Sequence, residues 1–70
     1  MKIQATEVSA PVYLHVERYA PGLASVRLYM PARTADEVPY RPRVCIMPAA
    51  HLLALWRELR RTHPVRLYFH

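Results

Sequence analysis

The strongest periodic pattern in this chain lies in its second half, where apolar residues recur at the spacing of an α-helix. The i, i+3, i+4 and i+7 positions of one helical side are Leu52, Leu55, Trp56 and Leu59. Pro48 suits the first helical turn, because the N–H that proline lacks would have no partner there. Pro64 restricts the preceding residue to extended conformations and therefore ends the helix. The pattern predicts a helix over residues 48–63.

Alternation of apolar and polar residues predicts strands before and after this helix. The alternating runs are residues 2–8, 12–19, 24–30, 43–47 and 65–69. Pro21-Gly22 is a turn signal between the second and third runs, so these two are expected to form an antiparallel hairpin. Residues 31–42 contain three prolines and are expected to form a loop. The elements predict one α+β domain over residues 1–70, in which one helix packs on one face of a mostly antiparallel sheet of four or five strands.

The same alternation divides the strand residues between two faces of the sheet. The face under the helix is expected to carry the apolar positions, among them Leu14, Val26, Val44 and Ile46. One helix cannot cover both faces, so the opposite face is expected to be exposed, and we call it the open face. Its expected residues are Lys2, Gln4, Tyr13, His15, Glu17, Tyr19, Arg27, Tyr29, Arg43, Cys45, Arg66, Tyr68 and His70.

The composition of the chain argues against a disulfide-stabilised, membrane-spanning or metal-binding protein. Cys45 is the only cysteine, which excludes an internal disulfide. A lone cysteine and an N-terminus without a signal-peptide pattern favour a reducing, cytoplasmic location. No apolar run approaches the ~20 residues that span a bilayer, so no membrane association is expected. No residues have the spacing of a zinc site, and neither a metal, a cofactor nor a small-molecule substrate is expected.

The net charge of +5 is concentrated in residues 41–70, because acidic and basic residues cancel in residues 1–40. The basic residues of the second part are Arg41, Arg43, Arg57, Arg60, Arg61 and Arg66, against Glu58 alone. Such a surface attracts polyanions, either nucleic acid or an acidic protein surface. Arg57, Arg60 and Arg61 are therefore candidate binding residues on the helix.

The residue types of the open face favour binding, and they leave the class of partner undecided. Single-stranded nucleic acid binds to sheets on which aromatic rings stack with bases and arginines contact phosphates. In this interpretation the stacking residues are Tyr13, Tyr19, Tyr29 and Tyr68, beside His15, and the phosphate-binding residues are Arg27, Arg43 and Arg66. Tyrosine and arginine are also enriched at protein–protein interfaces. In that case the same residues would anchor a homodimer or a host protein. A third alternative is that the face is a half-exposed sheet without a partner.

The small size of the chain suggests, by analogy only, a phage- or plasmid-type accessory protein that inhibits host defence or transcription. Val12 to Tyr19 followed by Pro21-Gly22, and Arg43 to Met47 leading into a helix with Trp56, are similar in pattern to the single-strand-binding transcriptional coactivators. Members of that family are dimers, each with a curved antiparallel sheet and one helix. Residues 24–30 and 65–69 lie outside the shared pattern.

A catalytic interpretation rests on three side chains expected near one another on the open face. His15 and Glu17 are two residues apart on one strand, and Arg27 lies on its hairpin partner. Around a phosphate, Glu17 would supply the base, His15 the acid and Arg27 the positive charge for metal-free RNA cleavage of the toxin type. A surface His-x-Glu pair without catalytic function is the alternative, and no glycine-rich phosphate loop or Ser-His-Asp signature is present. We therefore expect a non-enzymatic protein that binds a polyanionic partner, with a ribonuclease as the third interpretation.

Overall fold

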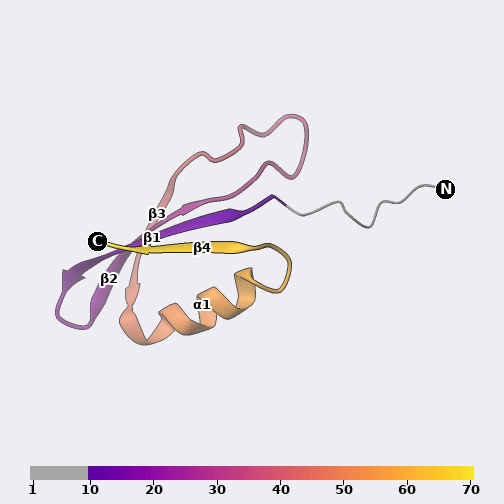
Figure 1. The fold of residues 1–70 in the computed structure, drawn as a ribbon. Coiled ribbons are helices and arrows are strands. Elements are labelled where there is room, and N and C mark those ends of the chain that lie inside the picture. Colours follow the sequence, from indigo (N-terminus) through magenta and orange to yellow (C-terminus); the bar gives the residue numbers. More distant parts are fainter. Residues whose placement is uncertain (1–9) are drawn as a thin grey trace.

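The alternating runs and the apolar stripe form the strands and the helix of a two-layer α+β fold (Figure 1). The computed structural model describes residues 10–70. In this range the elements are β1 (Val12–Ala20), β2 (Leu23–Tyr29), β3 (Arg43–Pro48), the 3-10 turn η1 (Ala49–His51), α1 (Leu52–Leu59) and β4 (Val65–Phe69). The strand expected at residues 2–8 lies outside the described residues. Within residues 10–70, no helix has the length and apolar character needed to cross a membrane.

The four described strands form one mixed sheet in the order β3-β2-β1-β4. β1 pairs antiparallel with β2, β2 pairs antiparallel with β3, and β4 pairs parallel with β1. The two edge strands β3 and β4 therefore run in the same direction. Because a parallel connection needs a crossover, α1 passes under the central strands, and no other helix or strand of residues 10–70 covers the opposite face of the sheet. The antiparallel sheet of the single-strand-binding coactivators is thus not reproduced at β4.

The hairpin between β1 and β2 has the expected turn. Gly22 adopts φ 77°, a left-handed conformation that is readily available only to glycine. The β1–β2 register is regular from Tyr13, opposite Tyr29, to Arg18, opposite Ala24. It then shifts between Arg18 and Ala20, so Tyr19 lies at a bulge rather than within the regular ladder.

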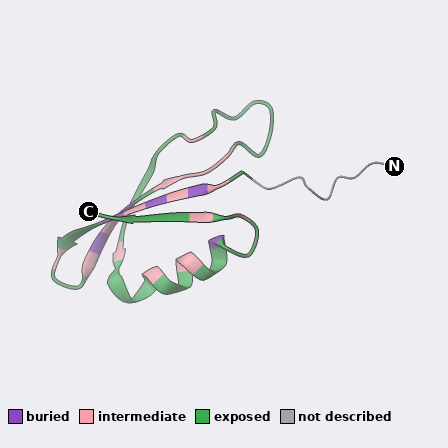
Figure 2. Ribbon diagram, in the orientation of Figure 1, coloured by how far each residue is buried: buried purple, intermediate pink, exposed green. Residues whose placement is uncertain are grey.

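The buried core lies between α1 and the central strands (Figure 2). Its members are Val12, Leu14, Val16, Ala24, Val26 and Leu59. Val12, Leu14 and Val26 are the most completely buried large side chains, with relative exposures of 0%, 1% and 1%. Leu52 and Leu55 pack against this cluster from the helix, as the apolar stripe predicts. The core is therefore small and depends on the two strands of the hairpin.

The helix is shorter than predicted. Pro48 is still part of β3, where it pairs with Leu23 and has an extended ψ of 137°. The next N–H, that of Ala49, donates to the Gly22 carbonyl at 2.9 Å and holds the chain against the hairpin turn. The α-helix begins only at Leu52 and ends at Leu59. One further turn follows α1 before Pro64, and in it the His63 N–H donates to the Leu59 carbonyl at 3.2 Å.

The prediction of which β3 side chains face the core is wrong. Arg43 and Cys45 lie opposite Leu28 and Val26, on the helix side of the sheet, whereas Val44 and Ile46 lie opposite Arg27 and Ser25 on the open face. Val44 and Ile46 are correspondingly 64% and 43% exposed. Met47 lies opposite the buried Ala24 and packs against the core, so it faces the helix side just before the chain turns under the sheet. Period two then fixes the side on which every preceding β3 residue lies.

On the helix side of the sheet, side chains leave a space between apolar residues next to the core. A cavity of about 410 Å³ lies between α1 and the β1–β4 edge, lined by Leu14, Val16, Ala49, Leu52, Leu53, Trp56, Leu67 and Phe69. Phe69 is 71% exposed and Leu53 is 51% exposed at its rim. The helix therefore covers the hairpin core well and the β4 edge poorly.

Candidate functional site

The open face is a grid of side chains whose rows follow from the strand registers. One row holds Tyr29, Tyr13 and Arg66 on β2, β1 and β4. The next row holds Val44, Arg27, His15 and Tyr68, across all four strands. A third row holds Ile46, Ser25 and Glu17. Six of the predicted binding residues, which are Tyr13, His15, Arg27, Tyr29, Arg66 and Tyr68, therefore share one surface.

His15 lies at the centre of an aromatic cluster on this face. Its ring stacks on Tyr68, with centroids 4.8 Å apart and planes 20° apart. The ring of Tyr29 meets it edge-on at 5.5 Å. On the third side, His15 Nδ1 lies 2.7 Å from His70 Nε2, with the two ring planes 14° apart. The N–H of His70 donates to the Val16 carbonyl and so extends the β4 ladder by one residue.

The environment of His15 disfavours its protonation. The pKa of His15 is lowered below its usual value of 6.5, mainly by loss of hydration. The positive charges of His70 and Arg27 lower it further. At neutral pH the imidazole is therefore uncharged, and it serves the face as an aromatic surface between two tyrosines.

Tyr40 extends the aromatic surface from the β2–β3 loop, and sequence reasoning missed it. Its ring meets Tyr13 edge-on at 5.6 Å. Its hydroxyl donates to the Pro11 carbonyl at 2.9 Å, and its N–H donates to the Met30 carbonyl at 2.8 Å. Tyr40 has φ 60°, in the left-handed region, and lies outside the alternating runs. No periodic signal could have assigned it to the face.

Several predicted residues do not join this surface. Tyr19 is 62% exposed at the bulge near the end of β1. Arg57, Arg60 and Arg61 belong to α1 and its C-terminal turn, which lie on the opposite side of the sheet. Arg60 lies 4.6 Å above the Trp56 ring, and Arg61 pairs with Glu58 at 3.4 Å. The helix arginines and the open face therefore form two separate basic surfaces.

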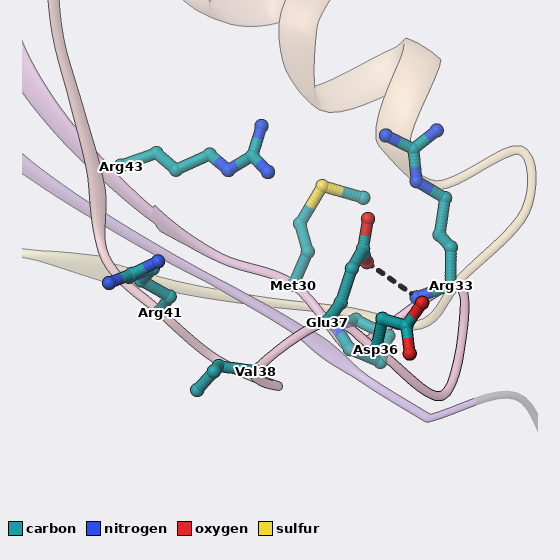
Figure 3. A pocket seen from close by; sticks show the side chains of 8 residues that line it. Met30, Arg33, Asp36, Glu37, Val38, Arg41 and Arg43 are labelled. Atoms are coloured by element: carbon teal, nitrogen blue, oxygen red, sulfur yellow. Dashed lines mark hydrogen bonds between the residues drawn. The ribbon is translucent and has the colours of Figure 1, made fainter.

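Arg43 belongs to a third region, formed with the β2–β3 loop (Figure 3). It lines a cavity of about 300 Å³ together with Met30, Pro31, Arg33, Asp36, Glu37, Val38 and Arg41. The Arg33 N–H donates to Glu37 Oε1 at 2.7 Å, which closes the loop on itself. Three arginines and two acidic residues line this cavity, so the charges nearly balance. This region lacks the aromatic residues of the open face.

The three rows of the open face contain one acidic residue, Glu17. It lines a cavity of about 130 Å³ with His15, Ser25, Arg27, Val44 and His70. A carboxylate in this position repels a polyanion that approaches Arg27. If this face binds a single-stranded oligonucleotide, Glu17→Gln should bind it two- to fivefold more tightly, as measured by fluorescence polarisation. Weaker binding by this variant would show instead that Glu17 contributes to the site.

The histidine, cysteine and acidic side chains of residues 10–70 form no group of three that could hold a metal ion. The chemistry supported by the face is stacking, hydrogen bonding and charge attraction. Comparison with protein families, with curated proteins and with solved structures found no significant match for this chain.

Proposed function

We propose that this protein binds single-stranded nucleic acid on its open face. The observation that carries the proposal is the placement of Arg27 and Arg66 within a surface of aromatic rings. Tyr13, Tyr29 and Tyr68 offer stacking surfaces beside these guanidinium groups. Each stacked base contributes about 1–3 kcal/mol to such complexes. A single strand fits this surface better than a duplex, because paired bases are already stacked and cannot turn onto the rings.

The two arginines are spaced to contact different phosphates. Arg27 lies on β2 and Arg66 on β4, one row apart in the grid. Strand spacing and rise place their Cα atoms about 12 Å apart, too far for both to grip one phosphate symmetrically. A bound strand would therefore cross β1 diagonally, over Tyr13 and His15. This arrangement suits a non-enzymatic binding protein, and the lone thiol of Cys45 favours action in the cytoplasm.

The test is a fluorescence polarisation titration with labelled single-stranded DNA, single-stranded RNA and duplex DNA. We expect one of the single strands to bind at least tenfold more tightly than the duplex. At about 0.7 ions per phosphate contacted, two phosphates give a slope of about −1.4 for log K against log salt concentration. Weak and equal binding to all three probes would contradict the proposal.

A protein partner is the second candidate, and the β3 row of the open face favours it. Val44 and Ile46 place exposed aliphatic side chains beside Arg27 and Ser25. An apolar centre next to arginine and tyrosine is typical of protein interfaces. A second copy of the chain and a host protein inhibited by an accessory factor are the two forms of this candidate. If no nucleic acid binds, sedimentation would test the first form and affinity capture the second.

A further inference from the structure

The direct contact between two histidines is the feature of the open face that stacking does not explain. His15 Nδ1 and His70 Nε2 lie 2.7 Å apart in nearly parallel rings. This distance is that of a hydrogen bond, so one nitrogen carries a proton and the other accepts it. The bond exists when the pair is uncharged and when it holds one extra proton. It is lost when both imidazoles are protonated, because both facing nitrogens are then donors.

The surroundings of the pair offer an anion two favourable groups and one unfavourable group. Ser25 and Arg27 line the adjoining cavity of about 130 Å³, together with Val44 and the carboxylate of Glu17, which opposes the anion. At about 30 Å³ per water molecule, it has room for roughly four waters or for one phosphate group. Arg27 lies directly opposite His15 across the hairpin, so its guanidinium can share a ligand with the imidazole.

The charged and titratable groups around His15 come from three strands and the residue after β4. β1 contributes Glu17, β2 contributes Arg27 and Tyr29, and β4 contributes Tyr68, followed by His70. β3 contributes the uncharged Val44. Without a ligand, Arg27 opposes the addition of protons to the histidine pair. An anion beside Arg27 removes this opposition and favours protonation.

We propose that the His15–His70 pair and Arg27 form a phosphodiester-binding subsite that takes up a proton from solvent when a single strand binds. A phosphate oxygen replaces the direct contact between the imidazoles and accepts a hydrogen bond from each of them. The subsite rests on the proposed function, because the same face must bind the strand. It adds a prediction that stacking and arginine contacts do not make, which is tighter binding at lower pH.

The direction of the pH effect follows from the lowered pKa of free His15. The bound phosphate raises the pKa of this imidazole, because its negative charge stabilises the imidazolium. Affinity therefore increases as the pH falls through the pKa of the complex, and it levels off below the pKa of the free protein. A phosphodiester keeps its charge over this range, so the titrating groups belong to the protein.

The experiment measures binding of a single-stranded oligonucleotide without terminal phosphates at pH 8.0 and pH 5.5, at constant ionic strength. One additional charge-assisted contact predicts about tenfold tighter binding at pH 5.5. In the double variant His15→Gln/His70→Gln, which lacks both imidazoles, this ratio should fall below twofold. The matched control is His63→Gln, because His63 follows α1 and bonds Thr62 rather than the open face. The control should retain the tenfold ratio, and circular dichroism at both pH values would establish that each variant is folded.

The outcomes separate the subsite from the proposed function. Binding at pH 8.0 that does not change at pH 5.5 would overturn the proton-linked subsite and leave the nucleic-acid proposal intact. Equal pH ratios in the wild type and the double variant His15→Gln/His70→Gln would also overturn it, since general surface charge would then explain the effect. Absence of binding at both pH values would overturn the subsite and the proposed function together. Imidazole NMR signals that shift for His15 and His70, but not for His51 and His63, would support the assignment directly.

Discussion

Replacing Leu14 with alanine is expected to lower the free energy of unfolding by about 2–5 kcal/mol, the range for large-to-small changes in a core. Leu14 is 1% exposed, lies on β1 and lines the apolar cavity beneath α1. The deletion would enlarge a space that the helix already fills incompletely. A chain of 70 residues has a total stability of about 4–10 kcal/mol at typical values per residue. This one change therefore removes a large part of the stability of the fold.

Urea unfolding followed by circular dichroism measures this effect as a lower midpoint at an unchanged slope. The matched control is Leu53→Ala, which deletes the same atoms from a side chain that is 51% exposed on α1. We expect the control to lose about 0.5 kcal/mol or less, as surface substitutions usually do. Similar losses in both variants would mean that the helix packs on the sheet more tightly than the cavity indicates. The core assignment would then be wrong.

The sequence predicted the elements of this fold because local patterns determine them. The run at residues 65–69 matches β4, and the turn at Pro21-Gly22 joins the expected hairpin. Alternation also assigned the β1 and β2 side chains to the correct faces up to the bulge at Tyr19, since the valines and leucines of residues 12–19 and of residues 24–30 lie on one side of each strand. The fold class followed from these elements and one amphipathic helix.

The side chains of β3 could not be assigned in the same way. Its apolar residues Val44 and Ile46 satisfy the alternating pattern and yet are exposed. The pairing of β3 with β2 places Met47 opposite the buried Ala24, and period two then places Val44 and Ile46 on the open face. The contact of Tyr40 with Tyr13 and that of His70 with His15 depend on how the loop and the end of β4 fold back. Such contacts arise from tertiary structure and leave no periodic signal.

The register of β3 also determines which arginines should matter for binding. The alternating pattern grouped Arg27, Arg43 and Arg66 on one face, whereas the structure places Arg43 on the helix side, opposite Leu28. If the open face binds nucleic acid, Arg27→Ala and Arg66→Ala should each weaken binding to a single strand about tenfold, the effect of one lost charge-assisted contact. The two sites lie far enough apart for their effects to add, so the double variant should lose about a hundredfold. The salt slope should also become flatter by about 0.7 for each arginine removed.

Arg43→Ala is the matched control, because it removes the same charge from the same sheet. Binding titrations at two salt concentrations should show less than a twofold loss for this variant. A loss equal to that of Arg66→Ala would mean that the strand reaches the helix side, and the open face would not be the binding surface. Unchanged binding in all three variants would exclude arginine–phosphate contacts from the sheet altogether. Arg57→Ala would then test the separate basic surface of α1, where removal of the charge should reduce affinity only if that surface binds the polyanion.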